Sequence, residues 1–143
     1  MHRPPNLDFN TPEDVEFAFS QVMKEHLGGR IDHIFLCHGT LCNMSILECD
    51  LPDFDQTLLI NVRSMVHMIS LAFPFMKMQH KEGSSITVLT SNLCEQPDPA
   101  RSVMAIASAM VKQMVQCTAL EGAYFNVRVN AVATGDVESR ARM

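Results

Sequence analysis

The stretch of chain that decides the fold covers residues 84–139 and reads SSITVLTSNLCEQPDPARSVMAIASAMVKQMVQCTALEGAYFNVRVNAVATGDVES. Its short apolar runs predict one strand over 85–89 and another over 126–132. The segment between them predicts a helix over about 100–121 that is apolar nearly all the way round. One sheet cannot bury every apolar side chain of such a helix, so a second surface must cover part of it. The apolar positions are Val103, Ile106, Ala107, Met110, Val111, Met114, Cys117 and Leu120.

The residues before this stretch continue the alternation of helix and strand. Thr11 and Pro12 are typical of a helix start, and a later pair of glycines supplies a stop. A buried strand is predicted over 33–37, and a helix over 52–79 follows it. Helices that alternate with strands predict an α/β fold with a parallel sheet and right-handed crossovers.

The composition predicts one globular domain over residues 1–143. Hydrophobic residues make up 47% of the chain and charged residues 19%, which is the opposite of a disordered composition. The net charge is −5 and no Lys/Arg cluster occurs, so nucleic acid is not expected as a partner.

The cysteines and the apolar runs indicate where the protein works. The five cysteines are an odd number without paired spacing, which favours a reducing, intracellular compartment. No apolar run reaches about 18 residues, so no membrane span is expected. The N-terminal residues do not resemble a signal peptide, and a cytoplasmic location is predicted, with a mitochondrial one left open.

Three segments together resemble one known family. They read GGRIDHIFLCHGT over 28–40, FDQTLLINVRSMVHM over 54–68 and RVNAVATGDVES over 128–139. Their order and spacing resemble the short-chain dehydrogenase/reductase family from Asp8 onward. The resemblance implies a partial Rossmann-like, doubly wound parallel sheet that corresponds to the C-terminal half of that family's domain.

The same resemblance locates the family's catalytic positions. Asn61 and Ser91 match the family's catalytic Asn and Ser. The catalytic Tyr lies thirteen residues after the Ser and the Lys four residues later, and those positions hold Met104 and Ser108. In the family the Tyr transfers a proton and the Lys lowers the pKa of the Tyr, which requires a group that titrates near the working pH. Neither Met104 nor Ser108 is such a group.

The cofactor positions are only partly retained. The resemblance matches Asp8, Gly39, Gly135 and Ser139 to cofactor-binding positions, here as vestiges. The family holds the pyrophosphate with a Gly-rich turn between its first strand and first helix, and that unit is expected to be lacking from a truncated chain. No bound cofactor is therefore predicted, and NAD(P) is expected if activity is retained.

Several alternatives remain open for single residues. Ser108 and Lys112 have the spacing of the family's Tyr and Lys if the alignment shifts by one turn. A structural role also accounts for a lone Ser91 or Asn61. No metal site is expected, because the soft ligands lack the short paired spacing of zinc sites. Those ligands are Cys37, His38, Cys42 and Cys49.

These patterns support three hypotheses of function. The first is a noncatalytic binding or assembly subunit that forms a homo-oligomer, or binds a protein partner, through helices 52–79 and 100–121. The second is an NAD(P)-dependent oxidoreductase fragment that a longer isoform or a partner chain completes. The third is a nonproductive fragment that folds poorly alone.

Overall fold

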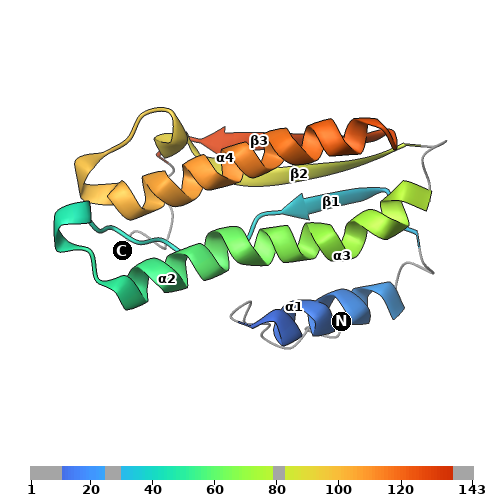
Figure 1. Ribbon diagram of the computed structural model, residues 1–143, viewed down its shortest axis with the longest axis horizontal. Coiled ribbons are helices and arrows are strands. Elements are labelled where there is room, and N and C mark those ends of the chain that lie inside the picture. The colour runs from blue at the N-terminus through green and yellow to red at the C-terminus, as the bar shows by residue number, and fades with distance from the viewer. Residues whose placement is uncertain (1–10, 25–29, 79–82, 137–143) are drawn as a thin grey trace.

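The computed structural model describes residues 11–24, 30–78 and 83–136, and its core is a three-stranded parallel sheet (Figure 1). The strands follow the order β1-β2-β3, with Leu36 opposite Val88 and Val88 opposite Ala131. The predicted α/β fold with a parallel sheet is thereby confirmed. The bounds are β1 His33–Leu36, β2 Ser84–Ser91 and β3 Val127–Thr134.

The first helix, α1, covers Pro12–Val22 and begins where the sequence predicts. The Thr11 side chain accepts a hydrogen bond from the Asp14 backbone N–H at 3.2 Å, which satisfies one of the free amides of the first turn. Val15 and Ala18 are buried, and the helix packs on α3. The glycine pair expected to stop this helix, Gly28-Gly29, lies outside the described residues.

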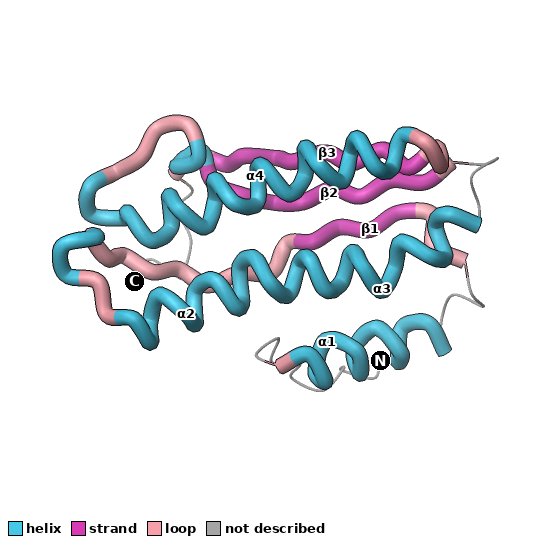
Figure 2. Tube along the Cα trace, viewed as in Figure 1, coloured by secondary structure: helices cyan, strands magenta, loops and turns pink. Residues whose placement is uncertain are grey.

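The first crossover between strands contains the short 3-10 helix η2, Ile46–Glu48, and then three consecutive helical segments in place of the one helix predicted over 52–79. They are α2 Leu51–Leu58, the π-helical segment η3 Leu59–Arg63 and α3 Ser64–Met78. A π-helical turn inserts one extra residue per turn and is common at functional sites. Before it, the loop after β1 runs past the start of α4 (Figure 2), where the Val103 backbone N–H donates to the Met44 carbonyl at 3.4 Å.

The second crossover is dominated by α4, which covers Ser102–Ala123. Its buried side packs on β2 and β3, and its approach to β3 depends on Gly122. A Cβ atom at position 122 would lie 2.7 Å from the Val127 carbonyl oxygen, so only glycine allows this close packing. The core beneath the helices includes Ile69, Ala72, Met76, Ile86, Val88, Val111 and Val129.

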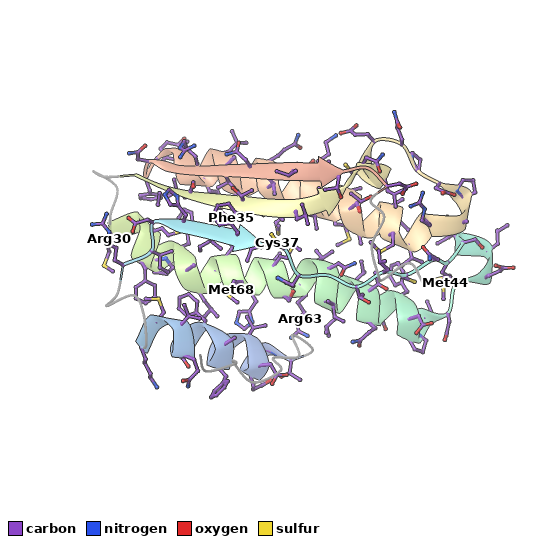
Figure 3. All side chains as sticks on the ribbon, turned by 180° about the vertical axis from the view of Figure 1, so that it is seen from behind. Arg30, Phe35, Cys37, Met44, Arg63 and Met68 are labelled. Atoms are coloured by element: carbon purple, nitrogen blue, oxygen red, sulfur yellow. The ribbon has the colours of Figure 1, made fainter. Side chains whose placement is uncertain are left out.

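One face of the sheet has no helix on it within the described residues. Helices α3 and α4 lie on the front face in Figure 1, and in the view from behind the strands lie nearest the viewer (Figure 3). Phe35, Leu89 and Val132 are 70%, 38% and 50% exposed. Parallel sheets are normally covered on both faces, so this face is an open part of the described domain.

The outer side of α4 is also uncovered. Its exposed residues recur at three- and four-residue steps, which makes one continuous stripe along the helix. We call this the outer stripe of α4, and it consists of Ile106, Ala109, Met110, Gln113, Cys117 and Leu120. The expectation that one sheet cannot cover this helix is confirmed for the described residues.

Two helical stretches, Leu51–Met78 and Pro99–Ala123, are long and apolar enough to cross a membrane by length and composition alone. Buried helices of α/β domains meet the same criteria. Here both stretches contribute to the core against the sheet, which is a sufficient reason for their apolar character.

Candidate functional site

A cleft of about 220 Å³ opens at the carboxyl ends of β1 and β2. Ligands of open α/β sheets bind at this end of the strands, outside their carboxyl termini. Three parts of the chain meet there: the loop after β1, the π-helical segment η3 and the first half of α4. The predicted site residues that line the cleft are Gly39, Asn61, Ser91, Met104 and Ser108.

Asn61 clamps the loop that follows β1. Its side-chain oxygen accepts from the Thr40 backbone N–H at 2.7 Å, and its amide donates to the Thr40 carbonyl at 2.9 Å. Asn61 lies within the π-helical segment and is 7% exposed. A Cβ atom on Gly39 would lie 3.3 Å from the Asn61 side-chain oxygen, so glycine leaves room for the clamp. Two hydrogen bonds of Asn61 therefore hold the backbone of the loop.

Ser91 ends β2 and begins the short 3-10 helix η4, Asn92–Cys94. Its hydroxyl accepts from the Leu93 backbone N–H at 3.2 Å and lies 3.5 Å from the Asn92 side-chain oxygen. Ser91 therefore lines the cleft and also caps a helical turn. The predicted structural role is present without removing the hydroxyl from the site.

Met104 and Ser108 lie one turn apart on α4 and face the same cleft. The Met104 sulfur lies 3.5 Å from the Asn61 amide nitrogen, and Ser108 is 4% exposed. The positions that the family resemblance gives to the Tyr and Lys thus meet Asn61 and Ser91 in space. Neither side chain carries a proton that titrates near neutral pH.

Lys112 does not supply the missing charge to this cleft. It forms an ion pair with Glu95 at the surface, and this hydrogen bond raises the pKa of Lys112 above its usual value. It is absent from the described residues that line the cleft. The geometry therefore does not support the shifted alignment, in which Ser108 and Lys112 would be the acid/base pair.

The expected cofactor positions separate into three groups. Gly39 lines the cleft, whereas Gly135 does not and is exposed after the end of β3. Asp8 and Ser139 lie outside the described residues. Near Gly135, the Arg101 guanidinium pairs with both Asp98 and Asp136, which ties the segment after β3 to the start of α4.

No cluster of three metal-binding side chains occurs in the described part of the chain. The cleft offers hydroxyl, amide and thioether groups, which can bind and orient a molecule.

His38 also lines the cleft, although it is not among the site residues that the sequence predicts. Its Nε2 atom lies 2.6 Å from the Ser64 hydroxyl, which in turn donates to the Ile60 carbonyl. Because the single Ser64 proton goes to Ile60, His38 donates from Nε2. Burial of the ring lowers the pKa of His38 below its usual value, so the ring lines the cleft in its neutral form at pH 7. The sequence signal that could have located His38 in this cleft is the predicted strand over 33–37, which ends directly before it.

Comparison with known proteins defines the class. A family model described as enoyl-(acyl carrier protein) reductase matches residues 5–143. Dehydrogenase/reductase SDR family member 6 of Aquarana catesbeiana is 31% identical over 133 residues, which are 93% of this chain and 51% of that protein. The NADH-type enoyl-(acyl-carrier-protein) reductase FabI of Rickettsia bellii is 27% identical over 139 residues, which are 93% of this chain and 50% of that protein.

Solved structures agree with the fold. Acetoin dehydrogenase from Enterobacter cloacae superimposes with a TM-score of 0.84 at 24% identity, over 95% of this chain and 53% of that one. ElxO with NADP bound gives 0.83 at 21% identity, over 94% of this chain and 53% of that one. These similarities show the fold, an α/β domain with a parallel sheet.

The chain belongs to the short-chain dehydrogenase/reductase family, as the resemblance of its segments predicts. It spans about half the length of the curated relatives it matches.

Proposed function

We propose that this chain is a noncatalytic member of the short-chain dehydrogenase/reductase family that acts as a binding or assembly subunit. The observation that carries the proposal is the presence of Met104 and Ser108 beside Asn61 and Ser91 in one cleft. The frame of the family's site is therefore retained while the groups that exchange protons are replaced.

The chemistry argues against carbonyl reduction at this cleft. Hydride transfer to a carbonyl leaves an alkoxide oxygen that needs a proton, and a positioned general acid typically contributes about 10²–10⁴-fold in rate. Met104 has no proton to transfer, and Ser108 has no charge with which to lower the pKa of a neighbour. His38 donates its proton to Ser64, so it is already engaged in the wall of the cleft.

A second function is supported by a specific observation, which is that Asn61 and Ser91 still share the cleft. In this alternative the chain is part of an NAD(P)-dependent oxidoreductase whose remaining half comes from further polypeptide. Relatives include proteins whose names specify NADH or bound NADP. NAD(P) is therefore the cofactor of this alternative.

The assembly role rests on the exposed apolar side chains of two helices. In the outer stripe of α4, Met110 is 44% and Leu120 is 73% exposed, and Val66 on α3 is 47% exposed. Covering such a surface with a second copy or a partner would remove it from water. We propose that helices 52–79 and 100–121 carry this contact, inside the cytoplasm, with no role for nucleic acid or a membrane span.

The noncatalytic function is tested by the oxidation of NADPH and NADH in the presence of a set of ketones and aldehydes. We expect no turnover above the background without protein. The matched control is Ser91→Ala, because turnover that arises in this cleft should fall when the Ser91 hydroxyl is removed. If the unchanged chain turns over a ketone or aldehyde, and Ser91→Ala lowers that turnover, the proposal is overturned and the oxidoreductase is favoured.

A further inference from the structure

The Ser108 hydroxyl lies at the wall of the cleft and has no hydrogen-bond partner among the described residues. Ser108 is 4% exposed and lines the cleft, and its side chain makes no hydrogen bond with any residue that the structure describes. Among the described residues, the buried side-chain oxygen or nitrogen without a partner is Ser84 Oγ, so the Ser108 Oγ is not enclosed and is open to the cleft. Its accessible direction is the cleft, so a molecule that enters the cleft can supply the missing hydrogen bond.

The walls of the cleft select against charge. Of the described residues that line it, none is Asp, Glu, Lys or Arg. The titratable side chains among them are Cys37 and His38, and burial keeps the His38 ring neutral at pH 7. A charged ligand would lose its hydration here without gaining a counter-charge, so an uncharged ligand is favoured.

The size and chemistry of the walls favour a single aromatic ring. The cleft has a volume of about 220 Å³. A protein cavity of about 150 Å³ holds benzene, so this cleft holds a ring with a short substituent. The side chains of Met65 and Met104 line it, and thioether sulfur makes favourable contacts with aromatic rings.

We propose that the cleft binds a small, uncharged aromatic alcohol, with the ring between the Met65 and Met104 side chains and the ligand hydroxyl on Ser108. A hydroxyl suits Ser108 because each partner can both donate and accept. This proposal rests on the proposed noncatalytic function, since it assigns a ligand class to the same cleft.

The experiment is a titration of the whole chain, labelled with ¹³C at the methionine methyl groups, with p-cresol. The Met104 signal is assigned by its loss in Met104→Leu, and the 72%-exposed Met78 serves as an internal reference. We expect the Met65 and Met104 signals to shift in a saturable way with a dissociation constant on the order of 1 mM, while Met78 does not shift. No saturable shift up to about 10 mM p-cresol, tenfold above that constant, would overturn the proposal.

The role of Ser108 is tested by comparing p-cresol with toluene, which has the same ring without the hydroxyl. We expect Ser108→Ala to weaken p-cresol binding about 2- to 10-fold, the effect of one hydrogen bond, and to leave toluene binding unchanged. Ser70→Ala, which removes an exposed hydroxyl from α3, should change neither. Equal weakening of both ligands, or no weakening of p-cresol, would contradict recognition by Ser108.

Binding of p-cresol and the turnover of ketones are separate measurements, so the ligand class and the noncatalytic function can fail independently. A phenol cannot accept hydride as a ketone does, so p-cresol binding does not report turnover. If p-cresol binds as expected and the chain also reduces ketones with NADPH, the ligand class is upheld and the noncatalytic function fails. If the chain neither binds p-cresol nor reduces ketones, the ligand class fails and the noncatalytic function stands.

Discussion

At the scale of single residues, Asn61 is the side chain on which the shape of the cleft depends most. It makes two hydrogen bonds to the backbone of Thr40, and it is nearly buried. We predict that Asn61→Ala lowers the free energy of unfolding by about 1–3 kcal/mol, because the Thr40 N–H and carbonyl lose their partners. Urea unfolding of the variant measures this change.

The matched control for that variant is Asn43→Ala. Asn43 is exposed in the loop after β1, and its replacement should change stability by no more than about 0.5 kcal/mol. Equal stabilities of Asn61→Ala and Asn43→Ala would show that the clamp contributes nothing.

The neutral state of His38 makes a prediction about pH. Because burial lowers its pKa in the folded state, the unfolded chain takes up a proton below about pH 6.5 that the folded chain does not. The folded state is therefore destabilised as the pH falls below that value. Because His38 exchanges a single proton, its contribution to the slope cannot exceed about 1.4 kcal/mol per pH unit.

The variant that tests this is His38→Gln, whose amide can still donate to Ser64. We predict that the difference in stability between the natural chain and His38→Gln is constant above pH 7 and shifts in favour of the variant between pH 6.5 and pH 5. Thermal unfolding at a series of pH values measures it. Parallel stability curves would mean that His38 titrates at its ordinary pKa.

At the scale of secondary-structure elements, the packing of α4 on β3 depends on Gly122. Alanine at a helical position normally adds about 1 kcal/mol of helix stability relative to glycine. Here the added Cβ would lie 2.7 Å from a backbone oxygen of Val127, and overpacking costs about 1–3 kcal/mol. We predict a net loss of stability for Gly122→Ala, measured by urea unfolding.

Gly135→Ala is the contrasting variant for this prediction. Its Cβ would meet the Asn92 side-chain nitrogen at 4.0 Å, an ordinary contact, so its stability should be unchanged or slightly raised. A stabilised Gly122→Ala would show that α4 can move away from β3 without cost.

The elements also show what the sequence could predict and what it could not. Periodic apolar residues predicted α4 over about 100–121, and it runs over Ser102–Ala123. The helix predicted over 52–79 contains the π-helical segment η3, which the apolar pattern does not reveal. The π-helical segment η3 places Asn61 against the Thr40 backbone. This contact joins two parts of the chain that are distant in sequence, so the local apolar pattern cannot predict it.

The cleft was predictable as a set of positions, because the family resemblance carries residues over by their spacing. Asn61, Ser91, Met104 and Ser108 do line one cleft. The roles of their neighbours were not predictable in the same way. The His38–Ser64 hydrogen bond and the unpartnered Ser108 hydroxyl depend on the spatial approach of β1, η3 and α4, which no local pattern encodes.

At the scale of the whole molecule, the described domain has two open apolar surfaces: one face of the sheet and the outer stripe of α4. Parallel sheets are normally covered on both faces. Single exposed apolar residues are common on proteins, but contiguous ones indicate contact sites. We therefore expect this chain to work in contact with another chain.

The measurement that tests this assembly role most directly is the molar mass of the purified protein by light scattering over a range of concentrations. We predict twice the mass of the 16.0 kDa chain, and a return to the single-chain mass in Met110→Glu/Leu120→Glu, which places charge in the outer stripe of α4. Leu47→Glu, at a 93%-exposed position outside that stripe, should remain dimeric. A single-chain mass at every concentration, or a dimer that persists in the double variant, would contradict the account.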